Sequence, residues 1–245
     1  MATGRLVEVY LDLLSQPCRA VHILLTCTKI PFEWTLVLAS LVCAGEHRTL
    51  DFTKLNPMQK VPVMVDDGFV LTESDAILKY LATKYDVPEH WYPRQPERRA
   101  RVDEYTAWHH TNTRPHAAKV FILEVLLPAQ SGSLVDEARL NRALSDLDDT
   151  LDKLESMFLR RQPFLCGDDI TVADLLAACE LTQPLGGGRD VLKERPQLQR
   201  WRSRVQSAVG EAFDKAHVSI NLSMNRCWSS IFEMKIKKSY LYFVP

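Results

Sequence analysis

The stretch Ser15–Cys18, Ser-Gln-Pro-Cys, brings a hydroxyl and a thiol to the start of a predicted helix. The first turn of a helix carries free N–H groups and a partial positive charge, so it stabilises a thiolate. A serine hydroxyl cannot exchange disulfides, but it can donate a hydrogen bond to a thiolate brought by a ligand, which contributes about 1.5–3 kcal/mol. Two alternatives stay open: Ser15 as an ordinary N-cap residue, and Cys18 as the thiol of a disulfide reductase.

A second stretch, residues 57–74, offers contacts for a peptide backbone and a carboxylate. It predicts a strand, a tight turn at Asp67-Gly68, a second strand and a helix start at Thr72–Ser74. Because Pro62 supplies no N–H, we expect Val61 to open the first strand with an unpaired backbone edge. Such an edge beside a helix N-terminus can bind a small peptide that carries a carboxylate. The alternative is an ordinary hairpin that leads into a helix.

These groups together describe one ligand. Ser15 offers a partner for a thiol, and Val61 offers one for a peptide backbone. The helix start at Thr72–Ser74 suits a carboxylate, and Glu73 suits a cationic amine. A thiol, a peptide backbone and an α-amino acid head group are the parts of glutathione.

The N-terminal third predicts the elements that position these groups. Strands at Leu6–Leu11 and Phe32–Leu38 flank a helix from about Cys18 to Thr28. Gly45–Leu55 reads as an irregular polar region with a short helix. The hairpin then leads into a helix over Ser74–Tyr85. The order β-α-β followed by β-β-α predicts a compact α/β unit on a small mixed sheet.

The rest of the chain predicts helices. One covers Glu97 to about Leu127, with a disturbance at Pro115. An apolar stripe predicts a second over Asp136–Arg160, and Ile170–Asp174 is a helix-capping signal. Another helix is expected from about Pro196 to Ala208.

These patterns divide the chain into four parts. We expect an N-terminal domain at 1–85, a linker at 86–96, an all-helical domain at 97–217 and a divergent C-terminal tail at 218–245. The tail is rich in aromatic residues and shows no sustained helical period.

Composition excludes several classes of function. A net charge of −1 gives no overall attraction to nucleic acid or anionic lipid. The six cysteines show no CxxC pair and no metal-ligand spacing, so we expect no metal and reduced thiols. Residues 1–11 lack the pattern of a signal peptide, and the longest apolar run, Leu36–Ala44, is too short to span a bilayer. We therefore expect a cytoplasmic protein without stable membrane insertion.

Over roughly residues 5–217 the chain resembles the glutathione transferases, specifically their theta class. The segments that carry the resemblance are Tyr10–Ala20, Gly45–His47, Asn56-Pro57, Lys60–Pro62, Leu71–Ser74, Trp91–Pro93, Ala100–Tyr105 and Ile170–Leu175. The resemblance implies an α/β thioredoxin-like N-terminal domain plus an all-α C-terminal helical domain, the cytosolic glutathione transferase architecture. It also implies a homodimer and a cis peptide bond at Val61-Pro62.

The resemblance assigns glutathione-binding roles in the N-terminal domain. His47 and Lys60 resemble the groups that reach the glycyl carboxylate, and Val61 resembles the residue whose backbone pairs with the cysteinyl part. Glu73 and Ser74 resemble the residues that hold the γ-glutamyl end. Judged without the family, His47 and Lys60 read as a solvated loop pair.

Further roles follow for Ser15 and the helical domain. Ser15 resembles the catalytic serine of theta-class enzymes, and Arg114 matches an arginine near the thiol pocket. Asp103 is expected to approach the glutathione site from the helical domain or from a neighbouring subunit. His110 is a candidate for the acceptor pocket. The alternatives are a surface charge for Arg114 and a structural histidine for His110.

Two segments depart from the family pattern. The loop before His47, through Leu38–Ala44, is about three residues longer than the family's usual spacing. The segment after about His217 does not resemble the family's C-terminal helix, which closes over the active site.

The implied activity is transfer of glutathione, used as a co-substrate without a cofactor, to small hydrophobic electrophiles such as halides and epoxides. Glutathione peroxidase activity is a further implication of the resemblance. The alternative is a glutathione-binding protein with weak or no turnover because the C-terminal segment is altered.

Overall fold

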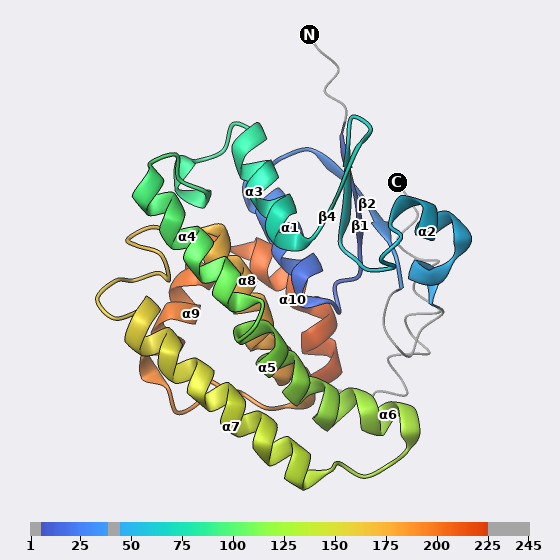
Figure 1. Ribbon diagram of the computed structural model, residues 1–245, viewed down its shortest axis with the longest axis vertical. Coiled ribbons are helices and arrows are strands. Elements are labelled where there is room, and N and C mark those ends of the chain that lie inside the picture. Colours follow the sequence, from blue (N-terminus) through green and yellow to red (C-terminus); the bar gives the residue numbers. More distant parts are fainter. Residues whose placement is uncertain (1–5, 39–44, 225–245) are drawn as a thin grey trace.

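The computed structural model of the chain describes residues 6–38 and 45–224. A four-stranded mixed sheet forms the N-terminal part, and helices form the rest (Figure 1). The strands are β1 (Val7–Leu11), β2 (Phe32–Leu36), β3 (Val63–Asp66) and β4 (Phe69–Thr72). Their order in the sheet is β2-β1-β3-β4. Strand β2 runs parallel to β1, whereas β3 is antiparallel to both β1 and β4.

The register of this sheet brings three chain segments to one edge. Tyr10 near the end of β1 pairs with Val63, the first residue of β3, and Val63 pairs with Thr72, the last residue of β4. Leu11 also pairs with Leu36, the last residue of β2. These strand ends therefore form one edge of the sheet. The loops that follow β1, β2 and β4 leave the sheet there, and so does the loop that precedes β3.

Helices cover both faces of the sheet. Helix α1 (Gln16–Cys27) and helix α3 (Ser74–Lys84) lie on one face, and α2 (Leu50–Leu55) lies on the other (Figure 1). Strand β1 alternates accordingly, because Val7, Val9 and Leu11 are buried in the main core while Tyr10 contacts Phe52 of α2. This alternation is the period of two that a sheet covered by helices requires.

The C-terminal part consists of helices joined by loops over its described residues. Its α-helices are α4 (Pro96–His109), α5 (Thr113–Phe121), α6 (Leu127–Ser131), α7 (Glu137–Lys153), α8 (Val172–Thr182), α9 (Pro196–Val209) and α10 (Glu211–Met224). Short 3-10 or π segments are η1 (Glu46–Arg48), η2 (Glu89–Trp91), η3 (Ile122–Leu126), η4 (Leu154–Phe158) and η5 (Gln183–Gly187). Every residue of α8 is buried, so this helix is the centre of the helical part and also packs against α1.

The predicted capping signal is confirmed at the start of α8. The Thr171 hydroxyl accepts from the backbone N–H of Ala173, and the Asp174 carboxylate accepts from that of Thr171 at 2.9 Å. The same carboxylate accepts from the indole of Trp201, 2.9 Å away. The box therefore caps the N-terminus of α8 and also joins α8 to α9.

The predicted fold class is confirmed, with four corrections to the expected elements. Strand β3 begins at Val63, not at Val61. The long helix breaks at residues 110–112 and not at Pro115, which lies in the first turn of α5 where no intrahelical N–H bond is lost. Regular helix α7 ends at Lys153, and a π segment continues it to Phe158.

The fourth correction concerns the C-terminal segment. Helix α10 continues to Met224, so residues 218–224 are helical although the sequence from residue 218 shows no sustained helical period. Residues 225–245 lie outside the described part of the chain, as do residues 39–44 of the lengthened loop before His47. Among the described residues, no helix combines the length and the apolar character that crossing a bilayer requires.

Candidate active site

Ser15 is the N-cap of helix α1, and its side chain makes no capping hydrogen bond. Its backbone is extended, at φ −80° and ψ 125°, and its hydroxyl makes no hydrogen bond to the N–H groups of the helix it precedes. The Ser15 N–H donates to the Asp12 carbonyl at 2.8 Å, and the Ser15 carbonyl accepts from the Arg19 N–H at 3.2 Å. Both backbone groups are thus fixed while the half-buried hydroxyl stays available to a ligand.

The Cys18 thiol one turn further is a poor nucleophile. Burial raises the pKa of Cys18 to about 12, and a hydrogen bond with Ser15 offsets only part of that effect. The side chain is fully buried in the core. A thiol that stays protonated at neutral pH does not attack disulfides, which argues against a reductase that uses Cys18.

Val61 stands outside the strand ladder, just before β3. Its peptide bond to Pro62 is cis, as the family resemblance implied. The turn that presents it is held by Asn56, which is almost fully buried. The Asn56 amide donates to the Lys60 carbonyl at 2.7 Å, and its oxygen accepts from the Met58 N–H at 3.0 Å. Our sequence analysis gave Asn56 no role, although an Asn-Pro pair is a recognisable turn signal.

Glu73 and Ser74 lie at the start of α3, directly after β4. Glu73 is exposed and has φ 66° and ψ 114°, a backbone conformation that is strained for a residue with a side chain. Ser74 is the first residue of the helix and is buried. The strain at Glu73 turns the chain sharply from the sheet edge into the helix. Ser74 therefore follows Thr72 at the edge where β1 also ends.

His47 and Lys60 differ in their surroundings. His47 lies in the short turn η1 and is half-buried, and its Nδ1 atom is shielded without a hydrogen-bond partner among the described residues. Lys60 is exposed. A shielded ring nitrogen without a partner is uncommon in folded proteins.

Asp103 on α4 is tied to helix α3. Its carboxylate lies 2.8 Å from the ammonium of Lys79 and 3.1 Å from the hydroxyl of Tyr92. Lys79 also reaches Asp75 in the first turn of α3, at 2.8 Å. The contact thus joins the helical part to the helix that starts at Ser74.

Arg114 and His110 occupy different environments. The Arg114 guanidinium donates to the carboxylate of Glu180 at 2.7 Å, and that carboxylate is almost fully buried. Arg114 is therefore more than a solvated surface charge. His110 is exposed at the end of α4, whereas its neighbour His109 is buried and its burial lowers the pKa to about 3.

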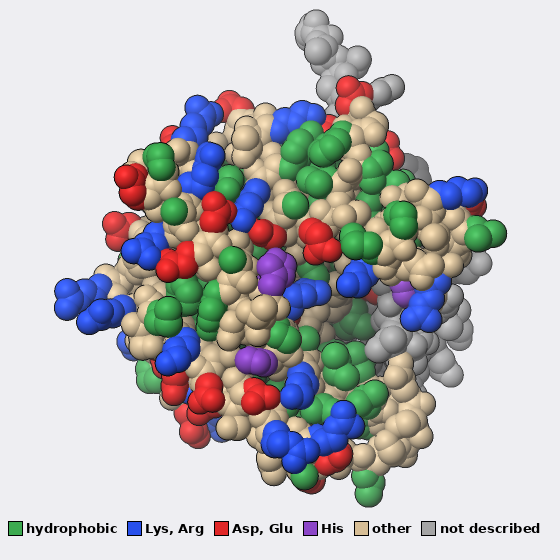
Figure 2. All heavy atoms as spheres, in the orientation of Figure 1, with side chains coloured by type: hydrophobic (Ala, Val, Ile, Leu, Met, Phe, Trp, Pro, Cys, Tyr) green, Lys and Arg blue, Asp and Glu red, His purple; other side chains and the backbone are tan. Residues whose placement is uncertain are grey.

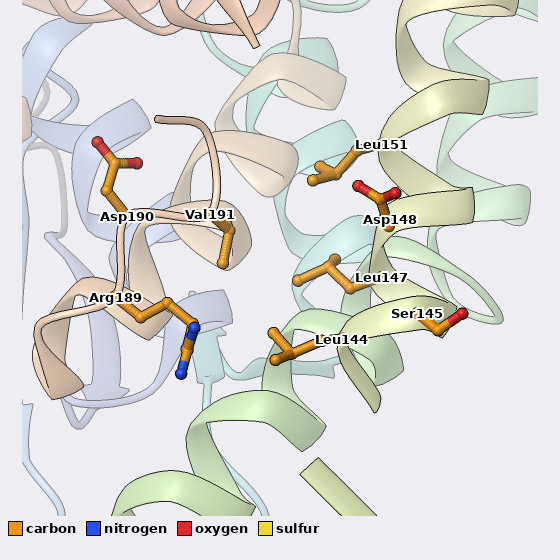
Figure 3. Close-up of a pocket in the computed structure, with 8 residues that line it drawn as sticks. All are labelled: Leu144, Ser145, Leu147, Asp148, Leu151, Arg189, Asp190 and Val191. Carbon is orange, nitrogen blue, oxygen red and sulfur yellow. The ribbon is translucent and has the colours of Figure 1, made fainter. Parts of the chain in front are cut away.

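Two hollows lie outside this constellation. A cavity of about 350 Å³ lies between α7 and the segment after η5, with Leu144, Leu147, Leu151 and Val191 facing it beside charged groups (Figure 3). Another of about 410 Å³ is lined by α4, the end of η4 and the loop that follows it. None of the predicted glutathione ligands lines either of them. No group of three or more side chains suited to a metal ion occurs within residues 6–38 and 45–224.

Comparison with known proteins agrees with this geometry. The chain matches the family models "Glutathione S-transferase, N-terminal domain" over residues 15–84 and "Glutathione S-transferase, C-terminal domain" over residues 117–208. It is 48% identical to the theta-1 glutathione S-transferase of Bos taurus over 212 residues, which are 86% of this chain and 87% of the relative. The corresponding human enzyme is 47% identical over the same length. The chain belongs to the theta class of the glutathione S-transferases.

Solved structures of the family match the whole described fold. Apo human glutathione S-transferase T1-1 has a TM-score of 0.84 and 46% identity, with 90% of this chain and 91% of the other covered. A human theta-class enzyme in complex with the glutathione conjugate of 1-menaphthyl sulfate also has a TM-score of 0.84, at 38% identity. This match covers 96% of this chain and 92% of the chain of that human enzyme. Membership makes this protein a transferase that conjugates glutathione.

Proposed function

We propose that Ser15 activates the thiol of glutathione for attack on small electrophiles. The observation that supports the proposal is the hydroxyl of Ser15 at the N-cap of α1, which makes no capping hydrogen bond to the helix. A donated hydrogen bond and the positive end of the helix both favour the thiolate over the thiol. The Cys18 thiol, which hydrogen-bonds with Ser15, stays protonated and is a weak hydrogen-bonding partner that a thiolate can replace.

The rest of the tripeptide follows the sheet edge. The backbone of Val61 lies outside the ladder and is free to pair with the cysteinyl part. Glu73 and Ser74 would hold the γ-glutamyl group at the start of α3, and His47 and Lys60 would reach the glycyl carboxylate. The shared register of Tyr10, Val63 and Thr72 supports this layout, because it brings the three backbone segments to one edge.

The helical part completes the proposed site. Asp103 would approach glutathione through its link to α3, and Arg114 would lie near the thiol. His110 would face the acceptor. The molecular surface is hollowed between the side that holds α2 and helices α5 and α6, with hydrophobic side chains on its walls (Figure 2). An apolar acceptor suits such a hollow.

The chemistry requires no covalent bond to the protein and no cofactor. The glutathione sulfur forms a bond to carbon while the halide, or the oxygen of an epoxide, leaves that carbon with the bonding pair. With a peroxide, the sulfur attacks one oxygen and the O–O bond breaks, so the other oxygen leaves as an alkoxide and takes up a proton. A second glutathione then attacks the sulfur of the resulting sulfenic acid, which gives the disulfide and water. The protein contributes proximity and a lowered thiol pKa. Detoxification of such electrophiles in the cytoplasm is the corresponding cellular role.

The proposed assembly is a homodimer. Phe69 and Val70 on the edge strand β4 are about half exposed, at 49% and 42%. Hydrophobic side chains gather on the surface where β4 and α3 lie (Figure 2). A second copy of the chain is the partner that would cover this surface.

The decisive experiment replaces the hydroxyl of Ser15. We expect Ser15→Ala to raise the thiol pKa of bound glutathione by one unit or more and to lower kcat/KM about tenfold or more at pH 6.5. Thiolate absorbance of the complex and initial conjugation rates measure the two effects. Ser15→Thr keeps the hydroxyl and is the matched control.

Undiminished activity in Ser15→Ala would contradict the role of this residue. A wild-type protein that is retained on immobilised glutathione, but turns over no member of a broad panel of electrophiles, would instead support the binding-protein alternative.

A further inference from the structure

Arg19 is a fully buried guanidinium that contacts three parts of the fold at once. One of its terminal nitrogens donates to the carbonyls of Leu13 and Leu14, at 3.0 and 3.1 Å. The other donates to the Cys179 carbonyl at 2.9 Å and to the Gln183 side-chain oxygen at 2.6 Å. A rigid planar fork with fixed donors suits this task, and a flexible lysine does not.

The acceptors of Arg19 lie on both sides of the boundary between sheet and helical part. Leu13 and Leu14 form the loop between β1 and α1, immediately before Ser15. Cys179 lies near the end of α8, and Gln183 begins η5. Arg19 thus links the loop that carries Ser15 to Gln183, which lies 164 positions after Arg19 along the chain.

We propose that Arg19 is a positioning residue that sets the place of the Ser15 hydroxyl by fixing this loop to the helical part. The inference rests on the proposed role of Ser15. A hydrogen bond to a thiolate depends steeply on distance and angle, so a small shift of the loop weakens it. The conformation of η5 thereby affects a reacting atom that η5 does not touch.

The other ionisable groups around Arg19 do not replace it. Glu180 on α8 and His217 on α10 are both buried. The charge of Glu180 favours the protonated form of Arg19, and the charge of Arg19 in turn disfavours a protonated His217. Cys179 and Cys18 are buried, and burial raises the pKa of each thiol to about 12. In the described part of the chain, Arg19 is the side chain that donates to the Leu13 and Leu14 carbonyls, and none of these four does so.

The test compares three variants by the thiol pKa of bound glutathione. Arg19→Lys keeps the positive charge but loses the fork, and we expect the thiol pKa to rise by about one unit. The rate of conjugation well below that pKa should then fall about tenfold, because the thiolate fraction falls tenfold per unit. Gln183→Leu removes one acceptor far from Ser15, and we expect a smaller rise in the same direction.

Thr182→Val is the matched control, because it removes a buried hydrogen bond, from Thr182 Oγ1 to the Ala178 carbonyl at 2.6 Å, next to Gln183. We expect this variant to lower the melting temperature without changing the thiol pKa. If Arg19→Lys does not fold, Gln183→Leu decides by the same measurement.

An unchanged thiol pKa in Gln183→Leu and in any folded Arg19→Lys would overturn the proposal, since Arg19 would then only hold the two parts together. Ser15→Ala separates this failure from failure of the proposed function. If Ser15→Ala raises the thiol pKa and the Arg19 and Gln183 variants do not, only the positioning role is wrong. If Ser15→Ala also leaves it unchanged, both fail.

Discussion

At the scale of a single residue, burial changes the protonation of the Glu180 carboxylate. Its carboxylate is 2% exposed, and burial raises its pKa to about 7, although Arg114 and Arg19 offset part of the effect. One of its oxygens accepts from Arg114, and the other is buried without a partner among the described residues. The folded protein therefore binds a proton at Glu180 between about pH 4.5 and 7, whereas the unfolded chain does not.

We predict a pH-dependent stability from this residue. Because the folded state binds more protons in that window, the free energy of unfolding should fall as the pH rises through it, by about 2–3 kcal/mol. Glu180→Gln should lack this part of the pH dependence in urea unfolding at pH 5 and pH 8. Glu104→Gln, on the exposed face of α4, is the control. Identical pH profiles for wild type and Glu180→Gln would refute the assignment.

Glu73 combines backbone strain with a proposed ligand contact. Glycine adopts a positive φ without strain, so Glu73→Gly removes a cost of about 1–3 kcal/mol and loses about 0.5–1 kcal/mol to chain entropy. We expect the free energy of unfolding to be maintained or raised, while KM for glutathione rises about tenfold or more because a charged contact is lost.

The control for this prediction is Glu73→Ala, which removes the carboxylate and keeps the strain. Both variants should weaken glutathione binding to the same extent. The free energy of unfolding should be higher for Glu73→Gly than for Glu73→Ala. Calorimetric titration with glutathione and chemical unfolding measure the two quantities. Equal stability of the two variants would show that the strain has no energetic consequence.

At the scale of elements, the start of α8 depends on Asp174. The fully buried carboxylate accepts from the N–H groups of Thr171 and Leu165, each at 2.9 Å, and from Trp201. Asp174→Ala leaves these buried donors without a partner, so we expect a loss of about 3 kcal/mol or more in the free energy of unfolding.

Asp169, five residues earlier, provides the contrast. It is exposed and pairs with Arg98 at 3.3 Å, and exposed pairs contribute about 0–1 kcal/mol. Asp169→Ala should therefore change the unfolding midpoint little. A loss of similar size in both variants would mean that the capping box is not the cause.

At the scale of the whole molecule, the exposed surface of β4 tests the proposed homodimer. Replacing Phe69 by Glu adds a charge to the surface that a second copy would cover, and a buried unpaired charge is costly. We expect Phe69→Glu to sediment as a monomer of about half the wild-type mass. Asp67→Lys, in the adjacent exposed turn, changes charge away from the strand and should leave the mass unchanged.

Two results would contradict this prediction. One is a wild-type protein that sediments as a monomer, and the other is a Phe69→Glu variant that keeps the wild-type mass.

Local patterns in the sequence were sufficient to predict several structural elements of this protein. The helix start after Ser15, the hairpin around Asp67-Gly68 and the capping box at Thr171 each depend on neighbouring residues, whose backbone preferences act over a few positions. The family resemblance added the two-part fold and the ligand roles. The break before α5 was misplaced because a proline signal was read without the turn that precedes it, at residues 110–112.

Only the tertiary structure decided which distant groups meet. The shared edge of β1, β3 and β4 follows from their pairing, and the contact between Arg19 and Gln183 joins residues 164 positions apart. The raised pKa of Glu180 likewise depends on the helices that exclude water from it. Burial and electrostatic coupling arise from packing between remote segments, and no local pattern of residue types contains that information.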